Sequence, residues 1–146
     1  MRFHLGTALL LFTWAITPSA TQAQQLPPGV LAFQADEIAW QESPVGWRMA
    51  ELYGDMTSSD YSVVRLRMQP NWDAPAHTHL RTELEVVRVQ SGTMYLAFGE
   101  ELTREAAVAY GPGSFIVYPA GTTSRMFTGD EEVIVIEECF CDEYGV

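Results

Sequence analysis

The sequence of 146 residues contains no lysine, and all eight of its basic residues are arginines. Without a lysine the chain cannot form a Schiff base with a substrate or use a lysine nucleophile. It also has no serine nucleophile elbow, no Walker loop and no dinucleotide-binding glycine fingerprint. These absences exclude several widespread classes of enzyme chemistry.

Long apolar runs are missing as well. The apolar stretch from Leu5 to Ile16 is interrupted by one glycine and two threonines, whereas a membrane-spanning helix needs about 20 apolar residues. It follows Arg2 and leads into small residues up to Ala23, which is typical of a secretory signal peptide. We expect cleavage after Ala23 and export to the periplasm or the exterior. A retained membrane anchor is the alternative.

Cleavage there would leave 123 residues, which is enough for one domain with its own core. Nineteen acidic residues against seven arginines give this part a formal charge of −12. Such a surface repels phosphate backbones and anionic membranes, so we expect no nucleic-acid binding and no membrane docking. The expected division is a signal peptide over 1–23, an extended leader or edge strand over 24–45, and the folded domain over 46–146.

Most of the chain consists of short segments rich in β-branched and aromatic residues, separated by turns that contain glycine. The expected strands are 48–53, 61–69, 76–80, 84–90, 93–98, 114–118, 124–128 and 132–140. Only 102–108 suits a short helix. Many short strands at regular spacing predict an all-β sandwich or jelly-roll barrel. Most aromatic side chains are expected in its core, namely Trp40, Trp47, Tyr53, Phe98, Phe115 and Phe127.

Histidine is scarce: after loss of His4, only His77 and His79 remain. Residues two apart on a strand point to the same face, so the two imidazoles are expected to project together. Glu83 and Glu85 follow with the same spacing. Two imidazoles and a carboxylate inside a barrel suit a divalent transition metal, Fe, Mn, Zn, Ni or Cu. The alternative is two surface histidines beside a turn and an exposed acidic edge.

These residues resemble the first signature motif of the cupin superfamily. His77 and His79 form its His-x-His pair, Gly92 occupies its last position, and Asn71 stands where the motif begins with glycine. The resemblance implies that the histidine pair faces the inside of a barrel.

The glutamate of this motif can be assigned in two ways. Glu83 has the motif's distance from the histidines, whereas Glu85 has its distance from Gly92. The two counts differ because residues are inserted between His79 and Gly92, and insertions are tolerated best in a loop, here after Leu80. We therefore expect Glu85 as the metal ligand and Glu83 as its alternate.

The second cupin motif is present in altered form. Gly113, Pro119 and Gly121 match it, but Ser124 occupies the position of its histidine and Thr128 that of its asparagine. In metal-binding members that histidine is commonly the fourth protein ligand. The resemblance thus implies a site with one side of the ion unfilled.

Glu137 is the expected substitute for this ligand. It shares one face of the last strand with Val135, and the corresponding face carries polar residues in similar cupins, which implies that it points inward. A solvated carboxylate at the barrel edge is the alternative.

Trp72, next to a turn, is expected either to cover the barrel mouth or to pack within that turn.

The stretch 46–138 as a whole resembles small exported cupins, which implies a single cupin double-stranded β-helix (jelly-roll) barrel and a homodimer. It implies no reaction, because cupins differ widely in activity. We expect the protein to bind a divalent metal or a small polar ligand, with metal-assisted oxidation, isomerisation or lyase chemistry if it is an enzyme. The alternative is a metal-free, non-catalytic binding or structural protein. A nucleophilic triad is not expected, because it would have to use the same histidines.

Cys139 and Cys141 are the only cysteines. In a straight strand their side chains lie at the limit of disulfide geometry. Three arrangements remain open: a disulfide where the strand ends and the chain turns, pairing between two molecules, or binding of a soft metal.

Three arginines, Arg65, Arg67 and Arg88, are expected to pair with acidic residues or, if one faces inward, to hold a substrate carboxylate.

Overall fold

A computed structural model describes residues 26–56, 60–79 and 82–141, without the side chains of residues 82, 83 and 141. The expected signal peptide and its cleavage site at Ala23 lie outside this part. The chain divides into a short unit that ends at Phe33 and a larger unit that begins at Gln34. Within the described ranges no helix is long and apolar enough to cross a lipid bilayer.

The larger unit is built from β-strands. Their bounds are β1 Gln41–Glu42, β2 Trp47–Tyr53, β3 Tyr61–Met68, β4 His77–Thr78, β5 Thr82–Ser91, β6 Met94–Phe98, β7 Val108–Tyr110, β8 Phe115–Pro119, β9 Thr123–Thr128 and β10 Val133–Cys141. Each segment expected to form a strand contains one. The segment 102–108 forms no helix. A turn there is closed by a 3.3 Å hydrogen bond from the Ala107 N–H to the Arg104 carbonyl, and Val108 begins β7.

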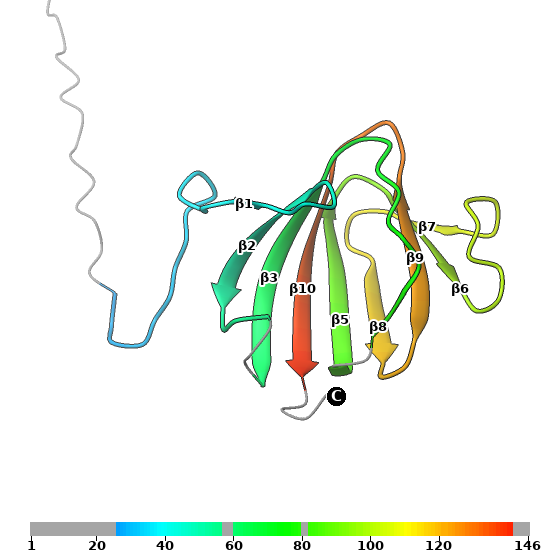
Figure 1. Cartoon of the computed structure of the whole chain (residues 1–146). Helices are drawn as coiled ribbons and strands as arrows, with labels where there is room; N and C mark the ends of the chain where they lie inside the picture. Colours follow the sequence, from blue (N-terminus) through cyan, green and yellow to red (C-terminus); the bar gives the residue numbers. More distant parts are fainter. Residues whose placement is uncertain (1–25, 57–59, 80–81, 142–146) are drawn as a thin grey trace, which may run out of the picture. The chain divides into compact units, whose positions relative to one another are not determined.

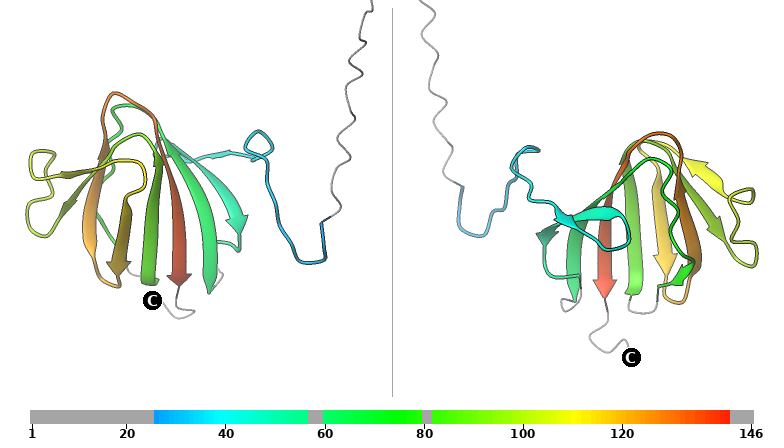
Figure 2. Two further views of the ribbon diagram at one scale, coloured as in Figure 1. Left: turned by 180° about the vertical axis from the view of Figure 1, so that it is seen from behind. Right: turned by 45° about the horizontal axis from the view of Figure 1, so that its top comes forward.

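The strands form two antiparallel sheets, which confirms the expected all-β fold. One sheet has the order β1-β2-β3-β10-β5-β8 and the other the order β4-β9-β6-β7. Figure 1 shows β2, β3, β10, β5 and β8 side by side in the larger sheet, with β9, β6 and β7 in the second layer. The two further views in Figure 2 show the same two layers. The last strand in sequence, β10, therefore lies in the middle of the larger sheet.

Alternation along the strands places the core between the sheets. In β3, the side chains of Ser62, Val64, Leu66 and Met68 are buried and those between them are more exposed. This period of two is the pattern of a strand with one face on the core. The side chains of β8 and β10 follow the same rule, and β5 contributes Val87 and Val89 to the same core, so these strands line a common interior.

Several aromatic side chains predicted for the core lie at the surface instead. Phe127 is buried, but Tyr53 and Phe115 are 56% exposed and Phe98 is 40% exposed. Phe115 alternates with the buried Ile116 on β8 and therefore points outward, where the Arg88 guanidinium lies 5.1 Å from its ring centroid. The prediction was wrong because aromatic content indicates a strand but not which face of it is buried.

Asn71 explains how the first motif keeps its shape without its glycine. Its φ is 58°, in the left-handed region, which among non-glycine residues asparagine adopts with the least strain. Its N–H donates a hydrogen bond to the Gly129 carbonyl at 2.6 Å. The backbone turn that leads to the histidines is therefore preserved.

Candidate functional site

A cavity of about 340 Å³ opens between the two sheets, near the lower end of the volumes of ligand pockets. It is lined by Trp47, Met56, Leu66, Met68, Trp72, His77, Thr78, His79, Glu85, Val87, Tyr118, Ser124, Met126, Val135, Glu137 and Cys139. His77, His79, Glu85 and Glu137, the residues singled out from the sequence, thus lie around one space. The side chain of Glu83 is outside the described residues.

Strand register separates the polar and apolar parts of this lining. Glu85 on β5 pairs with Tyr118 on β8 and with Cys139 on β10. Six residues earlier on β10, Val133 pairs with Met68, which also pairs with Trp47. At about 3.4 Å per residue, these two rows are roughly 20 Å apart along the strands. The cavity therefore has a polar end and an apolar end.

His79 connects two other polar side chains at the polar end. Its Nδ1 lies 2.7 Å from Glu85 Oε2, and its Nε2 lies 3.3 Å from Ser124 Oγ. A carboxylate only accepts hydrogen bonds, so Nδ1 carries the proton and donates to Glu85. In the neutral imidazole Nε2 is then the acceptor, directed at the Ser124 hydroxyl.

Tyr118 holds the His79 ring from the side. The two ring centroids are 4.6 Å apart with an interplanar angle of 25°, a stacked arrangement. Burial, and then the nearby carboxylates of Glu85 and Glu137, raise the pKa of Tyr118 above its usual value. Its hydroxyl therefore stays protonated at neutral pH and can donate a hydrogen bond.

His77 lies nearer the solvent than His79. Its Nδ1 donates to the Pro75 carbonyl at 3.1 Å, and its ring centroid is 4.9 Å from that of His79. Although β4 ends at Thr78, the ladder to β9 continues through the His79 N–H and the Thr122 carbonyl at 3.0 Å. Both rings therefore lie on the same side of the chain, and His77 is at the cavity mouth.

Glu137 is a buried carboxyl without a hydrogen-bond partner among the described residues. It is 7% exposed, and burial, with the Glu85 carboxylate as the second cause, raises its pKa well above the usual range. An unpaired buried carboxylate is costly, so the group is neutral at a pH where exposed glutamates are ionised. It therefore presents a proton donor to the cavity.

Stability should fall with rising pH because of Glu137. The Glu137 carboxyl binds its proton more tightly in the folded state than in the unfolded state. Its contribution to the free energy of unfolding is therefore complete below the unfolded pKa of about 4.3. It is lost as the pH rises through the raised folded pKa. Glu137→Gln should therefore be more stable than the wild type by about 1–3 kcal/mol at pH 8 and nearly equal to it at pH 4. Urea unfolding at both pH values measures this difference.

Glu138→Gln is the matched control, because Glu138 is the next residue on β10 and pairs with Arg88 outside the cavity. It should give no gain at pH 8. Parallel stability profiles of Glu137→Gln and the wild type across this pH range would show that Glu137 is not a protonated buried group.

The polar residues do not converge as metal ligands. Among the described residues no group of three histidine, cysteine, aspartate or glutamate side chains is arranged to hold an ion. Glu85 binds Nδ1 of His79 directly, and Ser124 occupies the place of the second-motif histidine. Glu137 lies in the same cavity but is unpaired. As these side chains lie, the described donors do not form a mononuclear metal site.

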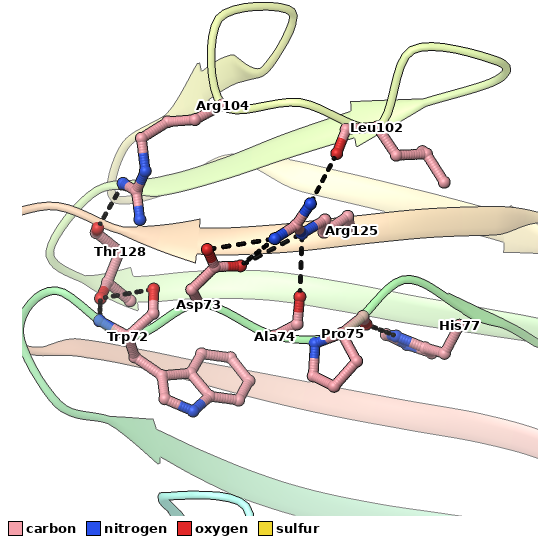
Figure 3. A network of polar contacts seen from close by, with 9 residues as sticks. All are labelled: Trp72, Asp73, Ala74, Pro75, His77, Leu102, Arg104, Arg125 and Thr128. Atoms are coloured by element: carbon pink, nitrogen blue, oxygen red, sulfur yellow. Dashed lines mark hydrogen bonds and ion pairs between the residues drawn. The ribbon is translucent and has the colours of Figure 1, made fainter.

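The segment that leads to the histidines is fixed to β9. Figure 3 shows the Arg125 guanidinium bonded to the Asp73 carboxylate at 3.1 and 3.2 Å and to the Ala74 carbonyl at 3.2 Å. Thr128 accepts a bond from the Trp72 N–H at 2.7 Å. Since β9 also carries Ser124, this network sets the position of the histidines relative to the serine.

Trp72 belongs to the interior. It is 9% exposed, lines the cavity, and its Nε1 donates to the Val45 carbonyl at 2.7 Å. Both sequence expectations for it are therefore partly met, because it packs in its turn and also walls the cavity.

The arginines expected as carboxylate ligands point away from the cavity. Arg65 bonds Gln90, Arg67 bonds Glu132 and Arg88 pairs with Glu138. They occupy the outward positions of β3 and β5, so the alternative in which one of them holds a substrate carboxylate is wrong. The prediction that they pair with acidic residues holds for Arg67 and Arg88.

Cys139 lines the cavity and is disulfide-bonded. The other cysteine of the chain is Cys141, whose side chain is outside the described residues. The strand is irregular between Phe140 and Cys141, where its register against β5 shifts. The disulfide state excludes the expected alternative in which Cys139 is a thiolate ligand for a soft metal.

Two contributors to the site were not recognised as such in the sequence. Tyr118 is one residue before Pro119 of the second motif. Its spacing of two residues from Ile116, which places both side chains on one face of β8, was the signal that it faces inward. Ser124 was noted only for the histidine it replaces. Its contact with His79 depends on side-chain conformation, which no sequence pattern gives.

Comparison of the sequence with protein-family models and with curated proteins found no match. Solved structures are similar. The polyketide cyclase RemF from Streptomyces resistomycificus has a TM-score of 0.64 and 17% identity, covering 77% of this chain and 80% of that one. The Cnp3 cupin domain of Schizosaccharomyces pombe has a TM-score of 0.61 and 12% identity, covering 76% and 74%. KdgF from Halomonas sp. has a TM-score of 0.60 and 20% identity, covering 73% and 90%. The chain has the cupin fold.

Proposed function

We propose that this cupin-fold protein binds a hydrophobic small molecule without negative charge in its cavity, and that His79, oriented by Glu85, exchanges a proton with what is bound. The observation that carries the proposal is the 2.7 Å contact between His79 Nδ1 and Glu85 Oε2 on the cavity wall. A carboxylate behind an imidazole fixes its tautomer and stabilises the imidazolium, which is the arrangement of a general base.

The class of ligand follows from the lining. No arginine lines the cavity among the described residues, and Arg2 and Arg81 lie outside them. The described arginines bond elsewhere, to Glu42, Gln90, Glu132, Glu138, Asp73 and the Thr128 carbonyl. A carboxylate or phosphate entering this space would lose its hydration without gaining a cationic partner from the described lining. Methionine and tryptophan side chains at the other end suit an apolar or aromatic body.

A matched series tests the binding: 3-phenylpropanol, 3-phenylpropylamine and 3-phenylpropanoate share one body and differ in their head groups. Binding is measured by titration of tryptophan fluorescence and by the rise in melting temperature. The alcohol or the amine should bind at least about tenfold tighter than the acid, a difference of about 1.4 kcal/mol.

Val135→Phe places a ring into the cavity and should abolish binding. Ile136→Phe, the next position on β10, is the control that should leave it unchanged. Equal or tighter binding of the acid, or no binding of any of the three compounds, would contradict the proposal.

A divalent metal held by His77, His79 and Glu85 is the second candidate, supported by the presence of all three in one cavity. Elemental analysis of protein purified without a histidine tag distinguishes the two. One equivalent of Fe, Mn, Zn, Ni or Cu in the wild type, absent from a His77→Ala/His79→Ala variant, would favour the metal. Low and equal metal content in both proteins would favour the metal-independent site.

A further inference from the structure

The contact between His79 and Ser124 gives the site a second property. Ser124 Oγ, His79 and Glu85 form a continuous chain of polar contacts, 3.3 Å from the hydroxyl to Nε2 and 2.7 Å from Nδ1 to the carboxylate. Because the imidazole proton is on Nδ1, the lone pair of Nε2 is available to accept the proton of the Ser124 hydroxyl. A nucleophile, a base and a group that orients the base are thus in order.

Ser124 and its partners are buried and held in fixed positions. Ser124 is 2% exposed, Glu85 is 6% exposed, and all three residues line the cavity. His77 pairs with Ser124 in the ladder between β4 and β9, and Tyr118 stacks on His79. The register and the stacked ring therefore hold the imidazole against the hydroxyl, as positioning for catalysis requires.

We propose that Ser124 is a nucleophile activated by His79 and Glu85, and that it cleaves uncharged esters whose apolar acyl group occupies the cavity. This inference rests on the proposed function for the ligand class and for the role of His79. It adds the atom that attacks and the bond that breaks. The distance from Oγ to Nε2 is slightly long for a hydrogen bond, as is common in such groups before substrate binds.

The reaction needs no reagent other than water. Ser124 Oγ forms a bond to the ester carbonyl carbon while its proton passes to His79 Nε2. The tetrahedral oxyanion then collapses, the ester C–O bond breaks, and the leaving alcohol takes the proton from His79. Water repeats the sequence on the acyl-serine and regenerates the Ser124 hydroxyl.

Two further groups on the wall can donate a hydrogen bond to the oxyanion, the Tyr118 hydroxyl and the Glu137 carboxyl. The product is a carboxylate, and the described lining contains no cationic arginine to retain it. The charge that forms during the reaction therefore favours release of the product.

The experiment is covalent labelling of the full chain with an uncharged alkyl fluorophosphonate, read by intact mass and peptide mapping. The wild type should take one label, on Ser124, and 4-nitrophenyl butyrate should give a burst of nitrophenol. Ser124→Ala should lose the label and at least about 10²-fold in esterase rate. Thr123→Ala removes the adjacent hydroxyl, which bonds Thr78, and should leave both unchanged.

A charged substrate tests the acyl site. 4-Nitrophenyl succinate, which carries a carboxylate, should react at least about tenfold more slowly than the butyrate. Melting temperatures of all variants verify that they fold.

Absence of a label on folded wild-type protein, a label on another residue, or unchanged esterase activity in Ser124→Ala would overturn the nucleophile. If the head-group series still binds as expected in that case, the proposed function stands without this step. If the label forms on Ser124 but the acid binds as well as the alcohol, the ligand class is wrong instead.

Discussion

Glu85→Gln is expected to slow the modification of Ser124 by the fluorophosphonate by roughly 10²- to 10⁴-fold, the range that acid–base catalysis contributes. Glutamine has nearly the shape of glutamate but can offer an N–H to Nδ1 of His79. The imidazole would then carry its proton on Nε2, the atom that must accept the proton of Ser124. In a serine protease, the equivalent change of tautomer has a cost at the upper end of this range.

Glu85 acts through His79, so its role has to be distinguished from a structural one. The maximal labelling rate should fall, whereas the probe concentration that gives half this rate should change by less than about threefold, because binding and reaction are separable. Glu85→Asp keeps the carboxylate and should recover part of the rate. An unchanged maximal rate in Glu85→Gln, or equal losses in Glu85→Asp and Glu85→Gln, would show that Glu85 does not orient the base.

Gly92→Ala is expected to cost about 2–5 kcal/mol of unfolding free energy. Gly92 lies between β5 and β6 with a φ of +73°, and a Cβ there would be 2.3 Å from the Glu132 carbonyl oxygen and 3.0 Å from the Val133 Cα. The positive φ alone costs about 1–2 kcal/mol for an L-residue. Relieving a clash with backbone adds about 1–3 kcal/mol, as in other overpacked sites.

Gly99→Ala separates these two contributions. Gly99 has a φ of +80°, but a Cβ there meets no atom within 4 Å. It should lose only the conformational part, about 1–2 kcal/mol. Urea unfolding of both variants under non-reducing conditions measures the difference. If both variants lose the same amount, the contact with β10 does not constrain Gly92.

The last glycine of the first motif therefore has a structural explanation. Glu85 contributes to the polar end of the cavity, whereas Gly92 lets the turn after β5 pass close to the start of β10. Gly92 directly follows β5, the strand on which Glu85 pairs with Tyr118 and Cys139.

Strand periodicity made most of the fold predictable. The alternation in β3 and β10 identifies both the strands and their inward faces, because one face of each is buried. The segment around Leu102 was less predictable, because its glutamates and alanines favour helix locally while Val108–Tyr110 pairs with β6. In the described part of the expected strand 76–80, β4 covers His77–Thr78, and Pro75 just before it cannot donate to the ladder.

The site was predictable in its members more than in its connections. The His-x-His spacing and the distance from Glu85 to Gly92 predicted that His77, His79 and Glu85 lie together, and all three line one cavity. The same spacing is compatible with shared ligation of an ion and with a direct bond between His79 and Glu85. Only side-chain conformation distinguishes these arrangements, and it also decides that Ser124 faces His79.

The central position of β10 has a consequence for how the protein folds. β10 follows every other strand in sequence, yet it joins β3 to β5, pairing residues as far apart as Tyr61 and Phe140. Closing such long loops before any pairing is gained makes folding slow, typically milliseconds to seconds for β-sandwich topologies. Until β10 docks, the larger sheet remains in two parts with unpaired edges. The side chains of Glu137 and Cys139 therefore reach the cavity only in the step that completes the sheet.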